Sequence, residues 1–310
     1  MPAVPHVGLF RLRAFEMPSA RSATFTGFGA IGLWGLLALF TTASGKVPPF
    51  QLTAMTFAIG GAIGLAVVMT RPGGLGALAQ PPLVWLHGVA GLFGYHALYF
   101  TALRFAPAAE ANLLNYLWPL LIVVFSALLP GHRLRLHHVA GAALGLAGTA
   151  LIIAGRGGLG SGFAAGHLVG YAAAVACALV WAAYSVSARL LPGVPTEAVA
   201  GFCLATAVLA GLCHLAFETT VWPADAAEWL AVAALGLGPV GAAFYLWDRG
   251  MKRGDIQVLG AASYAAPVLS TLALVAFGFA APTASLAVAV ALIVLGSLIA
   301  SRDMLRRRPA

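Results

Sequence analysis

Ten apolar segments of about 20 residues follow one another along this chain, and they restrict its fold more than any other feature. A helix of that length crosses a hydrocarbon core about 30 Å thick, because each residue advances the helix by about 1.5 Å. Only 8% of the residues are charged, against roughly 25% in a soluble domain. The runs also lack the alternating polarity of membrane β-strands. The sequence therefore predicts an all-α polytopic membrane protein with ten transmembrane helices.

The segments are separated by short breaks that contain Pro and Gly, such as Arg71-Pro72-Gly73-Gly74, and these residues stop helices. The ten helices are expected at 23–43, 50–70, 82–103, 108–129, 136–155, 166–190, 197–217, 227–250, 256–278 and 284–301. Residues 1–22 are expected to be a disordered cytoplasmic tail without a cleavable signal peptide, and residues 303–310 a basic cytoplasmic tail.

The basic residues predict the orientation. With the N-terminus in the cytoplasm and ten alternating crossings, 14 of the 17 Lys and Arg residues fall on the inside. The other three, Lys46, Arg104 and Arg156, fall on the outside. Because cytoplasmic loops carry an excess of Lys and Arg, both termini are expected in the cytoplasm. The net charge of +8 does not indicate nucleic-acid binding, since the basic residues lie between apolar runs.

The two halves of the chain match each other on either side of a glycine-rich linker at 156–165. An offset of 148 residues pairs Tyr116 with Tyr264 and Pro119 with Pro267, and an offset of 147 pairs Trp34 with Trp181. Five helices per half is an odd number, so the second copy must be inverted, as in many secondary transporters. The expected domains are a first five-helix repeat at 23–155 and a second, inverted repeat at 166–302.

A family resemblance is carried by residues 102–129, ALRFAPAAEANLLNYLWPLLIVVFSALL. This string resembles the segment that joins the third and fourth helices of EamA-type transporters, in the drug/metabolite transporter superfamily. The resemblance implies ten helices in two inverted five-helix repeats. The runs YHALYF and NYLWPL further resemble the bacterial aromatic amino acid exporters, which implies aromatic amino acids as solutes and the bacterial inner membrane as the location.

The chain departs from many relatives at one point. Those relatives carry a Gly-Glu pair after the fourth and ninth helices. This sequence reads PGHRLRL and FGFAAPT at the corresponding places, without an acid. No role of that acid is therefore transferred to this chain.

Rings and amides between positions 95 and 119 are the main candidates for a solute-binding wall. Tyr95 and Tyr99 are four residues apart and share one helix face, while His96 points about 100° away. Asn112, Asn115, Tyr116 and Pro119 are expected to share a face of the next helix. Aromatic rings would hold an apolar or aromatic solute and meet an ammonium group through cation–π contacts. The alternative is an interfacial belt of tyrosines with amides that join helices.

Other candidates lie in the middle of their helices. Trp118 and Trp181 either fill the bundle or line the path, and His96 is either a solute contact or a structural histidine. The candidate substrate-binding residues are Tyr95, His96, Tyr99, Asn115, Tyr116, Trp118, Trp181, Tyr184 and Tyr264. Pro119 and Pro267 each remove a helix hydrogen bond and are candidate hinges, although membrane helices also tolerate proline.

The acids and cysteines exclude several functions. Asp248 lies near a helix end, where Arg249 offers a pairing partner, and no carboxylate is expected near the midplane. A proton-coupled carrier usually has one there, so a facilitator or another means of coupling is favoured. No nucleotide-binding loop, HExxH, GxSxG or CxxC pattern is present, so no enzyme activity, cofactor or metal is expected. An ion channel would need a polar filter loop or a ring of charge, and the sequence shows neither of these features.

The sequence thus favours an exporter of small amphipathic metabolites, with aromatic amino acids as the leading solutes. Alternating access would use a central cavity at the repeat interface. Exporters of other metabolites remain the alternative, followed by an intramembrane enzyme or a channel. The expected partners are the solute and the lipid bilayer, and the chain is expected to be a monomer or homodimer. Tyr95, His96 and Tyr99 have no matching residues in the second half, where their equivalents are Ala243, Phe244 and Trp247, so they are the candidates for solute selectivity.

Overall fold

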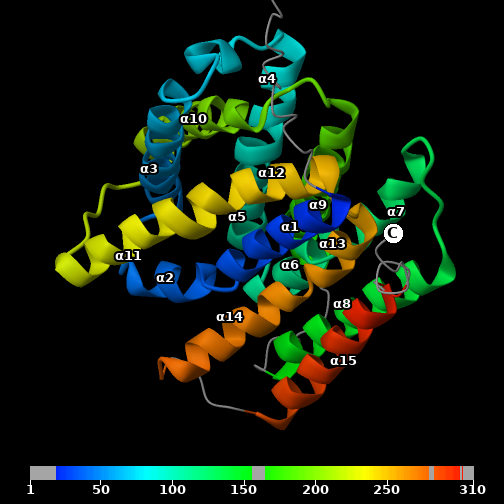
Figure 1. Ribbon diagram of the computed structural model, residues 1–310. Coiled ribbons are helices and arrows are strands. Elements are labelled where there is room, and N and C mark those ends of the chain that lie inside the picture. The colour runs from blue at the N-terminus through cyan, green and yellow to red at the C-terminus, as the bar shows by residue number, and fades with distance from the viewer. Residues whose placement is uncertain (1–18, 156–164, 279–282, 301, 303–310) are drawn as a thin grey trace, which may run out of the picture.

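The computed structural model of the protein describes residues 19–155, 165–278, 283–300 and 302, and its regular secondary structure is helical throughout these ranges. The α-helices are α1 (Ala20–Trp34), α2 (Leu37–Ala43), α3 (Pro49–Met69), α4 (Pro82–Val89), α5 (Tyr95–Phe105), α6 (Ala108–Asn115), α7 (Trp118–Phe125), α8 (Leu136–Gly155), α9 (Leu168–Ser187), α10 (Val199–Phe217), α11 (Ala226–Leu237), α12 (Ala243–Arg253), α13 (Ile256–Ala262), α14 (Ala265–Ala276) and α15 (Ala284–Ala300). Figure 1 shows their arrangement.

Shorter turns extend or join these helices. The π-helical turns are η2 (Ala90–Gly94) and η7 (Gly238–Ala242). The 3-10 turns are η1 (Gly74–Leu78), η3 (Ser126–Leu128), η4 (Ala165–His167), η5 (Ala188–Leu190) and η6 (Thr196–Ala198).

Eight helical stretches in the described residues are long and apolar enough to cross a membrane. They are Ala20–Ala43, Pro49–Met69, Pro82–Phe105, Glu110–Leu128, Leu168–Leu190, Thr196–Phe217, Ala226–Arg253 and Ile256–Ala276, and two shorter apolar helices are Leu136–Leu151 and Ala284–Ala300. Each lies where the sequence predicted a helix, with ends that differ by a few residues. The predicted tails and most of the predicted linker lie outside the described residues.

Helix ends follow from local chemistry. Pro49 and Pro82 each occupy the first helical position, where the missing N–H costs nothing and the fixed φ suits the helix. The Asp225 and Asp255 side chains accept backbone N–H groups at the starts of α11 and α13. Gly45 has φ of 76° directly after the first helical stretch, a conformation that glycine adopts at low cost.

Two kinds of irregularity recur in both halves. The π-helical turns η2 and η7 begin at Ala90 and Gly238, which are 148 residues apart. Helix breaks separate α6 from α7 around Tyr116 and α13 from α14 around Ser263 and Tyr264. These breaks precede Pro119 and Pro267 because each proline lacks the N–H that an unbroken helix would use. The sequence predicted kinks at the two prolines but not the π-helical turns.

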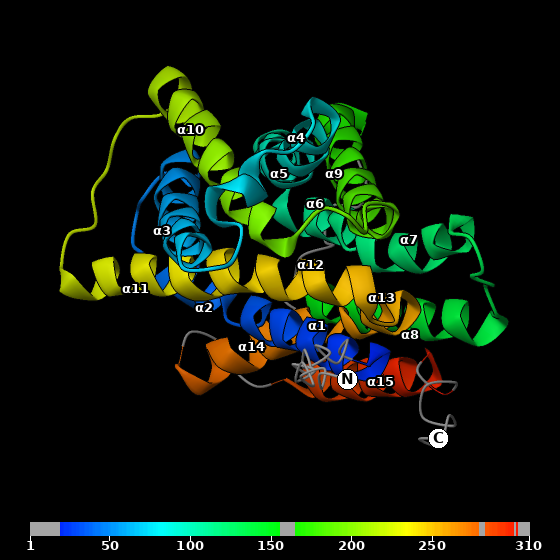
Figure 2. The ribbon, with the colours of Figure 1, turned by 45° about the horizontal axis from the view of Figure 1, so that its top comes forward.

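The main helix pairs each join one helix from before residue 156 to one from after residue 164. The pairs are α8 with α15, α3 with α10, α1 with α12 and α5 with α9, and Figure 2 shows α1 running beside α12. Glycine permits close approach in two of them. A Cβ on Gly141 would lie 2.4 Å from the Gly296 carbonyl oxygen, and one on Gly250 would lie 2.8 Å from Gly27 Cα. The two halves therefore form one interleaved bundle.

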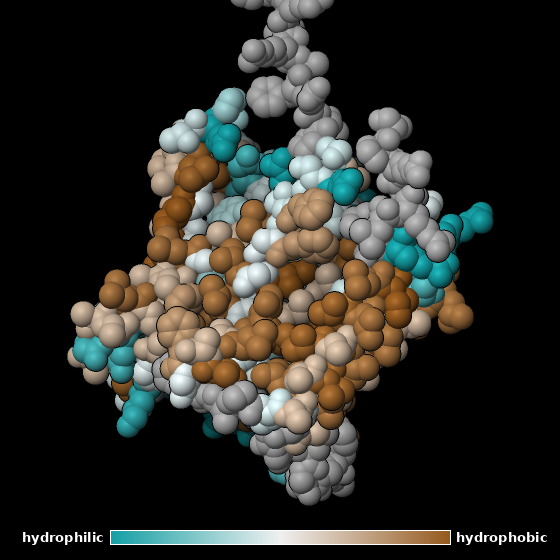
Figure 3. Space-filling model, turned by 60° about the horizontal axis from the view of Figure 1, so that its bottom comes forward, coloured by the Kyte–Doolittle hydropathy of each residue, from teal (hydrophilic) through white to brown (hydrophobic). Residues whose placement is uncertain are grey.

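The outer surface is apolar over much of its area. Figure 3 shows one face with hydrophobic side chains across its middle and hydrophilic side chains gathered toward its margins. Large side chains such as Leu83, Leu128, Leu136 and Leu215 are more than 70% exposed. A soluble protein rarely presents so much apolar surface, whereas a lipid bilayer covers it favourably.

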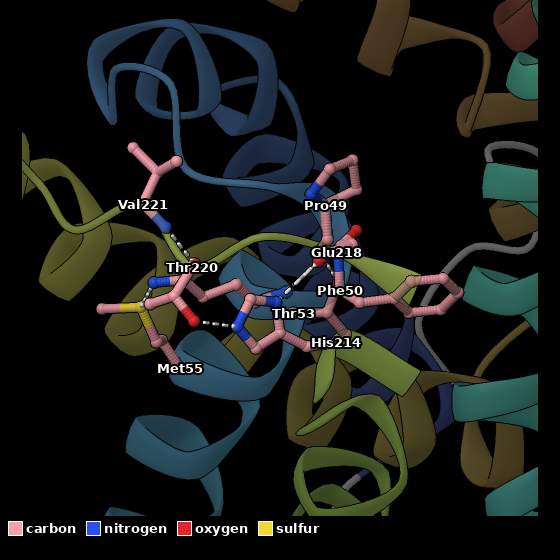
Figure 4. Close-up of polar contacts among 9 residues, drawn as sticks. Pro49, Phe50, Thr53, Met55, His214, Glu218, Thr220 and Val221 are labelled. Carbon is pink, nitrogen blue, oxygen red and sulfur yellow. Dashed lines mark hydrogen bonds and ion pairs between the residues drawn. The ribbon is translucent and has the colours of Figure 1, made fainter. Parts of the chain in front are cut away.

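A polar network connects α3 to the C-terminal end of α10 (Figure 4). The Glu218 carboxylate accepts the backbone N–H groups of Phe50 at 2.9 Å and Gln51 at 3.0 Å. His214 Nδ1 lies 3.0 Å from Glu218 Oε2, and His214 Nε2 lies 2.9 Å from the Thr220 hydroxyl. The network satisfies donors at the first turn of α3 that have no partner within that helix.

Candidate functional site

The centre of the bundle holds an aromatic group that we term the central cluster. It consists of Trp34, Trp118, Trp181, Phe244 and Trp247. Trp34 lies in the middle, with ring-centroid distances of 6.2 Å to Trp118, 5.7 Å to Trp181 and 5.0 Å to Trp247. All members except Trp34 are buried. The rings come from α1, α7, α9 and α12, so both halves of the chain build the cluster.

Hydrogen bonds fix the orientation of two indole rings in the central cluster. Trp247 Nε1 donates to the Ser185 hydroxyl at 3.0 Å. Trp34 Nε1 donates to the backbone carbonyl of Pro239 at 3.1 Å, within the π-helical turn η7. A π-helical turn shifts the backbone hydrogen-bonding pattern, which makes a carbonyl available to the ring. The irregular turn thus contributes to the geometry of the cluster.

A second set of rings lies on α5 beside the central cluster, and we term Tyr95, His96, Tyr99 and Phe100 the α5 rings. Tyr95 and Tyr99 are nearly parallel, with centroids 6.1 Å apart and an interplanar angle of 5°. Tyr95 also lies 5.3 Å from the Trp181 ring. Every α5 ring is partly exposed. The predicted stacking of Tyr95 and Tyr99 is confirmed, and these rings are partly exposed, whereas most of the central cluster is buried.

His96 is held by contacts on two sides. Its Nδ1 lies 2.7 Å from the backbone carbonyl of Leu92, in the π-helical turn η2. Its ring lies 5.1 Å from the buried Phe57 ring at an angle of 89°, and Phe57 in turn stacks on Phe244 at 5.4 Å. The Leu92 contact requires a proton on Nδ1, so Nε2 is the ring atom left for other contacts.

The two asparagines of α6 meet the tyrosines of α5. The Tyr99 hydroxyl donates to Asn112 Oδ1 at 2.7 Å, and Asn115 Nδ2 donates to the Tyr95 hydroxyl at 3.1 Å. Asn115 is 4% exposed. The expected juxtaposition of rings and amides on neighbouring helices is therefore found. The amides do not form one continuous face with Pro119, because the helix breaks at Tyr116.

Tyr264 does not join the other candidate residues. It is fully buried in a separate cluster with α8 and α15, and its ring lies directly over Gly145, where a Cβ would come within 2.3 Å of it. Its mirror residue Tyr116 is partly exposed at the break after α6. The two positions correspond in sequence but differ in environment.

Tyr184 lies on the other side of the central cluster, among a group of side chains that we term the inner plug. The inner plug consists of Ser187 and the residues that line the small cavity described below. Its ring is 5.4 Å from Trp181 and 4.8 Å from His87. His87 Nε2 lies 2.8 Å from the Ser187 hydroxyl. The plug encloses a cavity of only about 10 Å³, lined by Val84, His87, Tyr184, Ala188, Leu191, Val194, Phe202, Asp248 and Lys252. Such a volume holds at most about one water molecule, so the bundle is closed here.

Asp248 has different partners from the one expected. Its carboxylate lies 2.8 Å from Lys252 Nζ and accepts the Thr196 hydroxyl at 2.6 Å, while Arg249 is exposed. The sequence-based pairing with Arg249 is wrong because consecutive helical residues point about 100° apart, whereas Lys252 lies one turn away on the same face. Lys252 also donates to the Val194 carbonyl at 3.0 Å. These contacts attach α12 to the segment between α9 and α10.

Most of the predicted site residues therefore meet around one centre, with Tyr264 apart. Phe57, Phe244 and Trp247 were not predicted from the sequence as site residues, and neither was Trp34, which was identified only as the mirror of Trp181. A signal existed for two of them, since Phe244 and Trp247 are the mirror positions of His96 and Tyr99. Their convergence with Trp34 depends on contacts between distant helices.

The arrangement suits an aromatic or apolar solute. Accessible rings supply stacking and cation–π surface, and the amides and Tyr hydroxyls supply hydrogen bonds. No group of three or more His, Cys, Asp and Glu side chains in the described ranges could hold a metal ion.

Comparisons with known proteins agree with this picture. The model of the EamA-like transporter family matches residues 21–154 and again residues 168–302. The chain is 61% identical over 290 residues to a protein of Ancylobacter novellus named aromatic amino acid exporter YddG, covering 94% of this chain and all of that protein. It is 27% identical to the protein of the same name from Salmonella typhimurium, covering 82% of this chain and 87% of that protein. A crystal structure of a 60% identical protein superposes with a TM-score of 0.87 and covers 94% of this chain and all of that chain.

Proposed function

Because the chain belongs to the EamA-like transporter family, we propose that it is an exporter of aromatic amino acids in the bacterial inner membrane. The partly exposed α5 rings beside the largely buried central cluster are the observation that carries this proposal. The name of the 61% identical relative supports the same solute class. Apolar helices cover the outside of the bundle, as a multi-pass membrane protein requires.

The proposed binding surface is the wall formed by Tyr95, His96 and Tyr99, with the edge of the central cluster as its base. An aromatic side chain would stack against the partly exposed rings of Tyr95 and Tyr99, which are nearly parallel with an interplanar angle of 5°. The solute ammonium would meet the ring faces, and its polar groups would bond to hydroxyls and amides of α5 and α6. Tyr116 would lie beside the solute. Trp118 and Tyr184 are buried and would support the wall from beneath. Tyr264 has no part in this surface, because it is buried elsewhere.

We further propose ten membrane crossings in two inverted five-helix repeats, at 23–155 and 166–302, with both termini in the cytoplasm. Three observations support the repeat. The same family model matches twice, the π-helical turns begin 148 residues apart, and the breaks near Tyr116 and Tyr264 recur at the same offset. An odd number of helices per repeat then requires the inversion.

The α5 rings on one side of the central cluster are partly exposed, whereas the inner plug on the other side encloses only a very small cavity. This difference defines a conformational state. With the proposed orientation, the partly exposed α5 rings face the outside, and the inner plug lies toward the cytoplasm. Transport would alternate between this state and one in which the plug opens. Pro119 and Pro267, next to the helix breaks, are the proposed hinges.

Transport by the purified protein in proteoliposomes tests the solute class. We expect flux of phenylalanine, tyrosine and tryptophan to exceed flux of serine, both with and without a pH gradient. Replacing Tyr99 or His96 with Ala should lower aromatic flux at least about tenfold if the loss of solute contacts reaches about 1.4 kcal/mol. The control is Trp222→Ala, since this ring is 62% exposed and stacks on Trp229, away from the proposed wall.

Equal flux of serine and the aromatic amino acids would contradict the solute class. Normal aromatic flux in both ring variants would instead contradict the proposed wall. Flux that required a pH gradient would show that transport is coupled to protons and would replace the facilitator mechanism.

A further inference from the structure

A groove separate from the aromatic site lies on the side of the molecule, between α3 and the segment formed by η7 and α12. Its volume is about 340 Å³. Glycines make its floor, because a Cβ on Gly60 would lie 2.7 Å from Gly241 Cα, and one on Gly64 would overlap the Tyr245 hydroxyl. Gly236 also lines it. The backbones therefore approach closely, and the groove between the larger side chains stays open.

The rim of the groove is apolar and faces outward. Ile63 is 44% exposed, Val67 46% and Leu237 53%, and all three line the groove. They belong to helices that are long and apolar enough to cross a membrane. In a membrane the groove is therefore in contact with hydrocarbon chains, and an occupant with an apolar tail fits it.

One end of the groove is charged. Arg71 and Glu197 line it together with Thr196. They lie at the same end, because Arg71 falls between α3 and η1, and η6, which contains Glu197, packs against both of those elements. Within the described ranges, no hydrogen bond or ion pair joins the Arg71 guanidinium and the Glu197 carboxylate to each other or to a further residue. The end of the groove thus offers one positive and one negative group.

We propose that this groove binds phosphatidylethanolamine, with one acyl chain along α3 and the headgroup at the charged end. The Arg71 guanidinium offers paired N–H donors that suit a phosphate. The Glu197 carboxylate accepts hydrogen bonds from the primary ammonium. Phosphatidylglycerol lacks the ammonium, and phosphatidylcholine carries a quaternary ammonium without N–H donors. The opposite charges therefore select phosphatidylethanolamine among these lipids.

Native mass spectrometry of the full chain, given equal amounts of the three lipids with identical acyl chains, tests the selectivity. We expect bound phosphatidylethanolamine to exceed each of the other two at least about fivefold, as about 1 kcal/mol of charge-assisted hydrogen bonding provides. Arg71→Gln should abolish this excess. Glu197→Gln should also lower it and should shift the preference toward phosphatidylglycerol, since Arg71 remains. The control is Arg249→Gln, an exposed arginine that does not line the groove.

A second measurement locates the bound lipid. Phosphatidylethanolamine with a photoreactive acyl chain should crosslink to peptides that contain Gly64–Val68 or Ala242–Leu246. Equal binding of the three lipids, an effect of Arg249→Gln as large as that of Arg71→Gln, or crosslinks confined to other helices would each overturn the proposal.

Discussion

At the scale of single residues, the hydrogen bond between Asn115 and Tyr95 matters more for stability than the bond between Tyr99 and Asn112. Asn115 is 4% exposed, and within the described part of the chain its Oδ1 has no hydrogen-bond partner. The bond from Nδ2 to the Tyr95 hydroxyl is therefore the hydrogen bond that this amide makes. Asn112 is partly exposed and can bond to water when Tyr99 is changed. An unpaired buried amide costs about 1–3 kcal/mol.

Tyr95→Phe should therefore lower the free energy of unfolding by about 1–3 kcal/mol, and Tyr99→Phe by less. Thermal unfolding in detergent measures both. The double variant Tyr95→Phe with Asn115→Leu should recover most of the loss, because it removes both polar partners together. If Tyr99→Phe were the more destabilising change, or if the double variant were less stable than Tyr95→Phe, the assigned role of the Asn115 amide would be wrong.

The candidate site could be predicted from the sequence only in its local part. Tyr95, His96 and Tyr99 lie within one helical turn of each other, so the spacing alone predicts their relative directions. Trp34 and Trp247 are far apart in the chain, and their 5.0 Å contact results from the packing of α1 on α12. Helical periodicity does not contain that information. Tyr264 shows a second limit of the sequence. Its symmetry with Tyr116 suggested a similar role, but sequence symmetry does not specify the neighbours of a side chain.

At the scale of elements, the Glu218 network holds the beginning of α3. The carboxylate accepts two N–H groups of the first turn of α3 and lies 3.0 Å from His214 Nδ1. Glu218→Gln would remove the negative charge and turn an amide NH₂ toward one of these donors. We expect the free energy of unfolding to fall by about 1–3 kcal/mol, measured as a lower midpoint of thermal unfolding.

The matched control for this prediction is Glu228→Gln. Among the described residues, the Glu228 carboxylate accepts a hydrogen bond only from the nearby backbone N–H of Ala224 at 2.7 Å, so its loss should have a smaller effect. Equal midpoints for the two variants would show that Glu218 does not hold α3 as proposed.

The helices themselves were predictable from the sequence, because long apolar runs and Pro–Gly breaks determine where a membrane helix begins and ends. The π-helical turns were not. Gly91 and Gly94 in η2 and Gly238 and Gly241 in η7 are a signal in hindsight. In a chain with 37 glycines, however, most glycines serve packing, and a shifted hydrogen-bond pattern cannot be recognised from composition.

At the scale of the whole molecule, the inner plug must open if the protein works by alternating access. His87 on α4 and Ser187 on α9 come from different halves of the chain, and their side chains meet at 2.8 Å within the plug. Opening of the plug is expected to separate α4 from α9 and to break this bond, so removing the bond should favour the open state. A neutral hydrogen bond contributes about 0.5–1.5 kcal/mol, which changes the equilibrium between the two states about two- to tenfold.

His87→Leu should therefore raise the population with an open plug. The measurement is the labelling rate of Val84→Cys, a plug residue that is 7% exposed, in a background whose natural cysteines are replaced by alanine. A maleimide applied from the cytoplasmic side should react about two- to tenfold faster when His87→Leu is present. Leu75→Cys, at a position 57% exposed in η1, should react at one rate in both backgrounds. An unchanged labelling rate at position 84 would show that the His87 contact does not control the plug. Faster labelling from the opposite side of the membrane would show that the proposed orientation must be reversed.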